Sequence, residues 1–250
     1  MRGFVAILFI ACSGLVAQEA SSFSYACTED DVREFGLTCA DDEPCPVFLE
    51  LAEVEAAGST LILTGNLHTQ TTTMWGLLLV SDDGGKTWLE PAKRLKTAAL
   101  EHIQFSGLSH GWVSGVMIEP LPRNPFFLAT TDGGKTWRRY TMFEDTHFGS
   151  VQQFWFESDK TGELVLDGSQ GSTKRYEHYS TETGGDTWDV KEVTKIQPRL
   201  TKARPRENST WRIRVDSTAK AYRIEQRVAQ ASGLVWQTVA SLPVIVGECK

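Results

Sequence analysis

The sequence lacks any long apolar run beyond its first residues. After residue 17, no segment approaches the roughly 18 consecutive apolar residues that a helix needs to cross a bilayer. It also lacks low-complexity tracts, while 41% of the residues are hydrophobic and eight are tryptophan. A chain of this composition can bury a core. We therefore expect a folded protein without a membrane span.

Sequence patterns for metal binding and catalysis are missing as well. The five histidines are scattered and no Cys-x2-Cys pair exists. The Gly-Lys-Thr triplets at 85–87 and 134–136 lack the earlier glycine of a phosphate loop, and a strand led by tryptophan follows each instead of a helix. The sequence thus predicts no metal, no cofactor and no catalytic residue, and we expect a protein that is not an enzyme.

Basic residues are in the minority, but they cluster. The formal net charge is −7, which argues against nucleic acid as the partner. Residues 18–100 hold 5 basic and 14 acidic side chains, whereas residues 191–227 hold 11 basic and 4 acidic ones. The basic segment is interpreted either as a solvated loop facing the acidic N-terminal part or as a docking patch for an acidic protein surface. The candidate patch residues are Arg199, Lys202, Arg204 and Arg206.

The first 17 residues have the features of a secretory signal: Arg2, an apolar run and Leu-Val-Ala before Gln18. An alternative is a lipoprotein anchored through Cys12. Both predict an exported protein, periplasmic or secreted. Removal of the signal leaves four cysteines, and an even number in an exported chain predicts two disulfides. The candidates are Cys27, Cys39, Cys45 and Cys249.

The pairing of these cysteines is open from the sequence. Three of them lie within twenty residues, and Cys249 is next to the C-terminus. We therefore expect at least one bridge to join the two ends of the chain.

Three segments of the chain repeat without gaps. They are Ser-Asp-Asp-Gly-Gly-Lys-Thr-Trp at 81–88, Thr-Thr-Asp-Gly-Gly-Lys-Thr-Trp at 130–137 and Thr-Glu-Thr-Gly-Gly-Asp-Thr-Trp at 181–188. Their tryptophans are 49 and 51 residues apart, and an eroded fourth copy is expected 48 residues later, at Trp236. A period of about fifty residues is typical of repeat architectures such as propellers.

Each repeated segment has the chemistry of a tight turn followed by a core residue. Glycine supplies positive φ, the Asp or Thr side chain accepts hydrogen bonds from turn amides, and the tryptophan packs inward. We expect these to be structural residues. They are Ser81, Asp83, Gly85, Thr87, Trp88, Thr130, Asp132, Gly134, Thr136, Trp137, Thr181, Gly185, Thr187 and Trp188.

Runs of β-forming residues surround every repeat. Two strands precede each turn, the third enters it and a fourth leaves it, which predicts four-stranded units. The expected organisation is a signal peptide at 1–17, a cysteine-containing segment at 18–47 and a propeller at 48–250. Its units lie at about 48–97, 98–147, 148–197 and 207–246.

The repeated segment resembles the Asp-box, or bacterial neuraminidase repeat, which joins the third and fourth strands of a propeller blade. The first two copies match its pattern fully, and the third departs from it at Thr183. The stretch 105–115, with its Gly-Trp element, resembles the photosystem II assembly and stability factor family. The resemblance implies an all-β propeller of four, or five, four-stranded blades. A bridge from Cys249 would fasten the first blade to the fourth.

Two functions follow as expectations. The first is a non-enzymatic, monomeric, exported module that binds an unknown protein partner during assembly. The alternative is a carbohydrate-active propeller, either a sialidase-like glycoside hydrolase or a sugar-binding protein. Carboxylates gathered with arginine or aromatic side chains at one mouth of the ring would favour the alternative.

Overall fold

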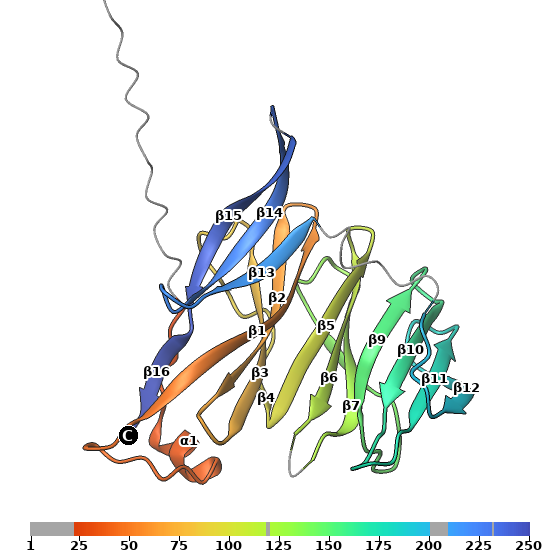
Figure 1. Ribbon diagram of the computed structural model, residues 1–250, viewed down its shortest axis with the longest axis horizontal. Helices are drawn as coiled ribbons and strands as arrows, with labels where there is room; N and C mark the ends of the chain where they lie inside the picture. Colours follow the sequence, from red (N-terminus) through yellow and green to blue (C-terminus); the bar gives the residue numbers. More distant parts are fainter. Residues whose placement is uncertain (1–22, 119–120, 201–209, 232) are drawn as a thin grey trace, which may run out of the picture.

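The computed structural model describes residues 23–118, 121–200, 210–231 and 233–250 (Figure 1). Within these ranges the chain is built from strands, with one short helix, α1 (Glu29–Glu34). No described helix has the length and apolarity needed to cross a membrane. The predicted signal peptide, Cys12 and the patch residues Lys202, Arg204 and Arg206 lie outside the described residues.

The strands form four antiparallel sheets that follow one another along the chain. The first sheet contains β1 (Cys45–Ala57), β2 (Thr60–His68), β3 (Thr73–Ser81) and β4 (Leu95–Lys96). The second contains β5 (Ala98–Ser106), β6 (His110–Met117), β7 (Arg123–Thr130) and β8 (Arg138–Thr141). The third contains β9 (Ser150–Phe156), β10 (Gly162–Asp167), β11 (Tyr176–Thr181) and β12 (Asp189–Thr194). The fourth contains β13 (Trp211–Asp216), β14 (Ala221–Gln230) and β15 (Gly233–Pro243).

The all-β propeller fold is confirmed, but the first and fourth sheets depart from four strands. The final strand, β16 (Ile245–Cys249), leaves the fourth sheet and pairs with the start of β1, with Cys45 opposite Cys249. The first sheet therefore has five strands in the order β16-β1-β2-β3-β4, and the fourth has three. Directly after Trp88, where a strand was expected, the chain makes only a bridge between Val80 and Leu89.

The sheets pack face to face in an arc, which Figure 1 shows from the fourth sheet at the upper left to the third at the right. The two-residue period of a strand sends neighbouring side chains to opposite faces. Leu61 and Leu63 of β2 accordingly join a core shared with the fourth sheet, whereas Ile62 joins the core shared with the second. On β6, Val113 faces the first sheet and Trp112 the third.

The two ends of this arc present polar faces. Among the described residues, buried apolar clusters join the fourth sheet to the first, the first to the second and the second to the third, but none joins the third to the fourth. The free face of the fourth sheet carries exposed arginines, Arg214 and Arg223, opposite each other on β13 and β14. On the third sheet, Gln153 Nε2 donates to the carbonyl of Pro198 at 2.7 Å. Apolar packing thus joins the four sheets of the arc at three boundaries.

Both predicted disulfides are present, and one of them joins the chain ends. Cys27 is bonded to Cys249 and Cys39 to Cys45. The segment around Cys27 runs along β16, where the Tyr25 amide donates to the Val246 carbonyl at 2.7 Å. The N-terminal segment, β16 and the start of β1 together fasten the first sheet to the fourth. We call this arrangement the clasp.

Trp236 does not occupy a fourth turn of the repeated type, so that prediction is wrong. It lies within β15 opposite Arg227, in the hairpin that joins the second and third strands of its sheet. The other three turns join third and fourth strands. The 48-residue spacing is preserved, but the fourth sheet has no outer strand for such a turn to enter.

The three repeated turns share one hydrogen-bond pattern. In the first, the Asp83 carboxylate accepts from the Thr87 amide at 3.0 Å and from its hydroxyl at 2.7 Å, while the Gly85 amide donates to Ser81 Oγ at 2.8 Å. These bonds, chiefly those from Thr87, hold the pKa of Asp83 well below its usual range. The same bonds, led by that from the Thr136 hydroxyl, lower the pKa of Asp132 to about 2. Each turn therefore depends on a charged acceptor or on a substitute for one.

The third turn uses a hydroxyl where the others use a carboxylate. Thr183 Oγ1 accepts from the Thr187 amide at 2.9 Å and lies 3.0 Å from the Thr187 hydroxyl. A neutral acceptor forms a weaker bond than an ionised one. The third turn therefore has the same geometry as the other two, but its hydrogen bonds stabilise it less.

Removing the long-range disulfide should destabilise the protein more than removing the short one. The Cys27–Cys249 bridge has a sequence separation of 222 residues and the Cys39–Cys45 bridge one of 6. The chain-entropy model assigns them about 5 and about 2 kcal/mol, respectively. Denaturant unfolding of Cys27→Ser/Cys249→Ser and Cys39→Ser/Cys45→Ser checks this. Equal losses of unfolding free energy in the two variants would show that the Cys27–Cys249 bridge does not stabilise the protein by closing a long loop.

Replacing Thr183 by Asp should stabilise the protein, because the new carboxylate can accept the two bonds that Asp83 and Asp132 accept. We expect a gain of about 1 kcal/mol, which raises the Tm by about 2–4 °C in a protein of this size. Thr183→Ala is the matched control and should lower the Tm. A Tm for Thr183→Asp at or below the wild-type value contradicts the interpretation.

Candidate functional site

A central cavity lies between the innermost strands of the four sheets. It has a volume of about 910 Å³ and is lined by residues within 50–55 of β1, 99–104 of β5, 152–155 of β9 and 211–213 of β13. In Figure 1 these strands lie side by side in the order β13, β1, β5 and β9. Each neighbouring pair is in contact. One wall of the cavity thus comes from each sheet.

The inner strands bulge where they line this cavity. The pairing of β1 with β2 shifts at Ala52, and the pairing of β5 with β6 shifts at Glu101 and His102. The pairing of β9 with β10 shifts at Gln152. A bulge re-aims side chains and is common beside active sites. Here the bulges turn polar side chains of three sheets toward one space.

Buried polar side chains of β2 and β5 connect neighbouring sheets. The Leu100 amide donates to Asn66 Oδ1 at 2.8 Å. Gln104, only 7% exposed, donates to the Phe156 carbonyl and accepts from the Phe156 amide, both at 2.8 Å. Thr64 Oγ1 donates to the Glu101 carbonyl at 3.2 Å and accepts from the Glu53 amide at 3.0 Å. These satisfied bonds fix the spacing of the cavity walls.

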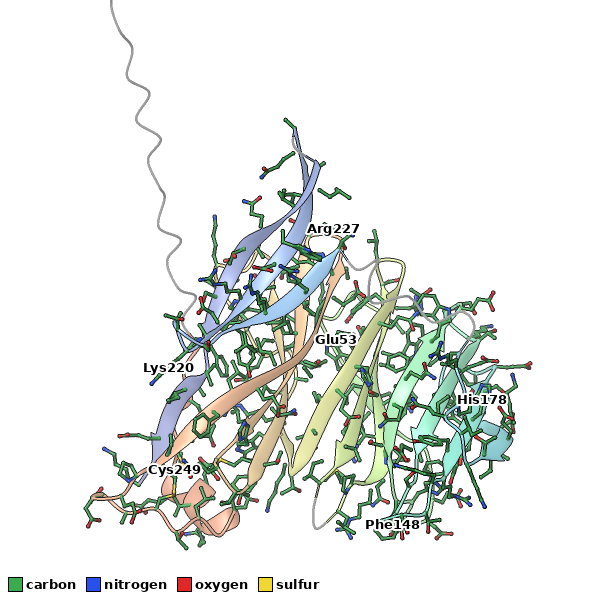
Figure 2. The ribbon with its side chains drawn as sticks, in the orientation of Figure 1. Glu53, Phe148, His178, Lys220, Arg227 and Cys249 are labelled. Atoms are coloured by element: carbon green, nitrogen blue, oxygen red, sulfur yellow. A yellow bond between two sulfur atoms is a disulfide. The ribbon has the colours of Figure 1, made fainter. Side chains whose placement is uncertain are left out.

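Glu53 projects from β1 toward β5 (Figure 2). Its Oε2 accepts from the Ile103 amide at 2.7 Å and lies 3.7 Å from His102 Nδ1. The carboxylate is thereby held in one position at the wall, half-buried, with a titratable imidazole beside it. Glu50, one pleat earlier on the same strand, is exposed.

Glu101 is the second carboxyl group of the bulged region and has a different environment. Its Oε2 is buried and has no hydrogen-bond partner. Burial raises the pKa of Glu101, and the nearby His102 offsets part of that rise. The protonated form of this side chain is therefore favoured more than in an ordinary glutamate.

The remaining walls supply aromatic and basic groups. Trp155 of β9 and Trp211 of β13 line the cavity and are both half-buried. Arg212 Nε donates to Glu225 Oε2 at 2.5 Å, and its guanidinium lies 4.2 Å from the centroid of the Trp236 ring. The cavity therefore combines carboxylates, indoles and one guanidinium.

This arrangement can recognise a polyhydroxylated ligand and can supply a proton. Carboxylates accept from hydroxyl groups, and half-exposed indoles offer apolar faces with a polar edge. A carboxyl group whose protonated form is favoured, such as that of Glu101, is also one of the two that acid–base cleavage of a glycosidic bond uses. In the part of the chain that the structure describes, no group of three or more histidine, cysteine or acidic side chains could hold a metal ion.

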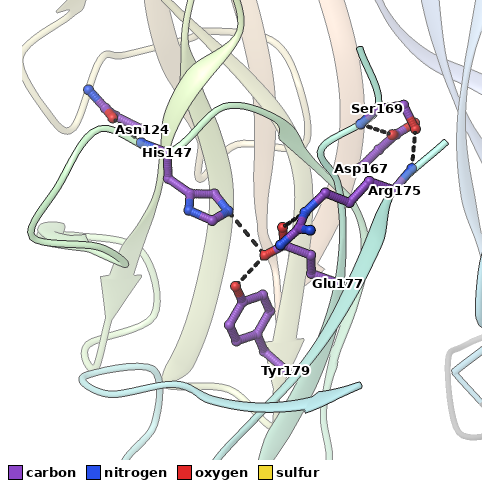
Figure 3. A network of polar contacts seen from close by, with 7 residues as sticks. All are labelled: Asn124, His147, Asp167, Ser169, Arg175, Glu177 and Tyr179. Atoms are coloured by element: carbon purple, nitrogen blue, oxygen red, sulfur yellow. Dashed lines mark hydrogen bonds and ion pairs between the residues drawn. The ribbon is translucent and has the colours of Figure 1, made fainter. Parts of the chain in front are cut away.

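A second polar cluster lies on the third sheet, away from the cavity (Figure 3). Glu177, 3% exposed, accepts from Arg175 Nε at 2.6 Å and from the Tyr179 hydroxyl, and it lies 3.1 Å from His147 Nε2. Burial alone would raise the pKa of Glu177, but these bonds outweigh it and lower the pKa. The cluster ties the loop before β9 to β11, and we assign it a structural role.

The residues singled out from the sequence lie elsewhere. None of the turn residues lines the central cavity. Arg199, the described member of the predicted patch, is exposed and is not part of the cavity wall. Two other arginines of the basic segment, Arg212 and Arg223, pair with Glu225 and Asp216 of their own sheet.

The cavity residues were missed although their strands were predicted. Glu53, Glu101, Trp155 and Trp211 all fall in runs expected to be the first strand of a repeat. The bulges that direct the side chains leave no comparable signal in a single sequence.

Comparisons with known proteins found only solved structures of low sequence identity. No family model matches the chain, and no curated protein matches its sequence. An α-L-arabinofuranosidase from Fusarium graminearum is 16% identical with a TM-score of 0.41, covering 76% of this chain and 58% of its own. An α-L-arabinanase from Penicillium chrysogenum is 13% identical with a TM-score of 0.40, covering 80% and 62%. YCF48 from Cyanidioschyzon merolae is 16% identical with a TM-score of 0.34, covering 78% and 73%. This chain thus matches less than two thirds of the length of the first two proteins.

Proposed function

We propose that this protein is an exported propeller that binds a carbohydrate in its central cavity. The observation that carries the proposal is the convergence of Glu53, Glu101, Trp155 and Trp211, one from each inner strand, on one cavity of about 910 Å³. A few convergent polar groups beside aromatic side chains in a large cavity are typical of a ligand site. The two disulfides are typical of exported proteins.

Sialic acid fits this cavity poorly. Sialidase-like recognition of its carboxylate would use three arginines, whereas among the described residues that line the cavity only Arg212 is an arginine, and it already bonds Glu225. Four glutamates line the same space. The sugar class that the site favours is therefore not an acidic one.

Substituting the cavity tryptophans should weaken carbohydrate binding. Isothermal titration against a panel of neutral, amino and acidic oligosaccharides identifies the ligand. Trp155→Ala and Trp211→Ala should then each lower affinity about tenfold, because an aromatic contact contributes about 0.5–1.5 kcal/mol beyond its buried area. Tyr140→Ala, in the outer strand β8, is the matched control and should bind normally. Failure of the whole panel to bind would contradict the proposal, while released reducing ends would extend it to hydrolysis with Glu101 as proton donor.

A second candidate function is docking of an acidic protein segment on the free face of the fourth sheet. Arg212, Arg214, Arg223 and Arg227 share this face, against Asp216 and Glu225. Figure 2 shows Arg227 on this sheet, whose hairpin β14–β15 projects from the body. Arg227 also lies over the Trp236 ring at 5.9 Å. An arginine-rich face favours an anionic partner.

Charge reversal tests this second candidate. Arg214→Glu/Arg227→Glu should abolish capture of a protein partner from the native envelope, because it makes the face net acidic. Lys86→Glu/Lys135→Glu, in the exposed turns, makes the same change of charge elsewhere and should leave capture intact. An unchanged set of captured proteins for the first variant would rule out docking on this face.

A further inference from the structure

The four cysteines that the structure describes gather at one place. Both bridges, Cys27–Cys249 and Cys39–Cys45, belong to the same apolar cluster. Figure 2 shows Cys249 at the end of β16, beside the start of β1. There Cys45 lies directly opposite Cys249 in the antiparallel pairing of the two strands. One half of the short bridge is therefore the neighbour of one half of the long bridge.

The backbone at this place suits a third pairing, Cys45 with Cys249. Directly opposite residues of an antiparallel pair point to the same face, with Cα atoms about 4.5–5.5 Å apart. The two existing bridges have Cα–Cα distances of 5.1 and 5.3 Å, and disulfides usually occur at about 4.4–6.8 Å. A bond between Cys45 and Cys249 therefore needs no movement of either strand.

The two bridges differ in their access to solvent. Cys249 is 0% exposed, whereas Cys39 and Cys45 are half-buried and flank a turn of exposed residues at 40–43. The short bridge also closes a much smaller loop and so stabilises the fold less. An accessible bridge of this kind is the one that an external thiol reduces first.

We propose that the Cys39–Cys45 bridge is a thiol–disulfide exchange site, through which a dithiol of the disulfide-oxidoreductase class rearranges the clasp. One thiolate of the dithiol attacks Cys39 Sγ, the Cys39–Cys45 bond breaks, and Cys45 leaves as a thiolate. The second thiol of the dithiol then attacks its own partner sulfur in the mixed disulfide and frees Cys39. Two electrons and two protons pass to the protein, and the dithiol leaves as a disulfide.

Cys45 carries the exchange to the buried bridge. Its thiolate attacks Cys249 Sγ, so the Cys45–Cys249 bond forms, the Cys27–Cys249 bond breaks, and Cys27 leaves as a thiolate that takes up a proton. This step transfers no further electrons to or from the protein. The new bridge closes a loop of nearly the same length as the old one, so β16 stays fastened to β1.

The rearrangement changes what the clasp holds. In the present structure Cys27 ties down the N-terminal segment, which packs against Trp75. The Trp75 indole Nε1 donates to the Tyr25 hydroxyl at 3.0 Å, and the Phe35 ring meets the same indole edge to face, with 5.1 Å between centroids. After the exchange only non-covalent contacts hold this segment. Reduction therefore loosens the N-terminal segment and leaves the first and fourth sheets joined.

The test follows the four cysteines in the folded exported protein with both bridges formed. Cys12, which lies outside the described residues, is changed by Cys12→Ser in every protein tested. The probe is dithiothreitol at about 0.1 mM, below the effective concentration of about 1 mM for a neighbouring thiol. Free thiols are blocked with N-ethylmaleimide, and non-reduced peptides are mapped by mass spectrometry.

Molecules that have lost one bridge should contain Cys45–Cys249 together with blocked Cys27 and Cys39. Because the two long loops have nearly equal lengths, this form should make up at least about a tenth of those molecules. Limited tryptic cleavage after the exposed Arg33 gives a second readout. The fragment that ends at Arg33 should separate from the rearranged protein without reductant and stay attached to the untreated protein.

A variant without the short bridge separates exchange from direct reduction. In Cys39→Ser/Cys45→Ser, Cys27 is released only when dithiothreitol attacks the long bridge itself, so its blocking should be about tenfold or more slower than in the wild type. Loss of the short bridge destabilises the fold, which by itself would speed the release. A slower release therefore reports the missing Cys45 thiolate.

Each outcome decides the proposal. A Cys45–Cys249 peptide, together with faster release of Cys27 in the wild type than in the variant, supports it. Retention of Cys27–Cys249 in every molecule whose short bridge is reduced overturns it, because the short bridge then only exchanges with solvent thiols. Equal rates of Cys27 release in the wild type and in Cys39→Ser/Cys45→Ser also overturn it, since the long bridge is then reduced directly.

Discussion

The pairing of the last strand with the first is the constraint on which the rest of the structure depends. β16 lies against the start of β1, and the Cys27–Cys249 bridge ties the N-terminal segment to the same place. Gly247 permits this approach, because a Cβ there would come within 2.1 Å of the Tyr25 carbonyl oxygen. The clasp holds the fourth sheet against the first and so places β13 beside β1. Without it the cavity would lack one wall.

Inside the arc, hydrogen bonds from buried polar side chains hold neighbouring sheets together, as main-chain hydrogen bonds hold the strands of one sheet together. Asn66 and Thr64 of β2 and Gln104 of β5 bridge neighbouring sheets with hydrogen bonds of 2.8, 3.2 and 2.8 Å, respectively. Glu53 belongs to the same set, since it accepts from the Ile103 amide of the next sheet. A side chain that both lines the cavity and connects two sheets is positioned by the fold rather than by its own rotamer preference. The site therefore inherits the rigidity of the scaffold.

The two open faces of the arc divide the charge of the molecule. The free face of the fourth sheet is basic, whereas on the third sheet His178 lies 3.5 Å from both Glu163 and Glu192. In the described part of the chain, neither of these two faces takes part in the buried apolar clusters that join the other faces of the sheets. The central cavity, lined mainly by acidic β1 and β5, lies between them.

The sequence by itself determined the local elements: a fifty-residue period, turns with Gly85 and Gly134 at positive φ, and strands that alternate around Leu61 and Ile62. These follow from backbone sterics and hydrophobic periodicity, which act over a few residues. Tertiary structure alone decided that Cys27 rather than Cys39 pairs with Cys249, and that Trp236 lies in a hairpin instead of a turn. It also decided that bulges bring Glu53 and Glu101 to one cavity. Those outcomes depend on which strands, far apart in the sequence, pack against one another. A single sequence does not show those contacts.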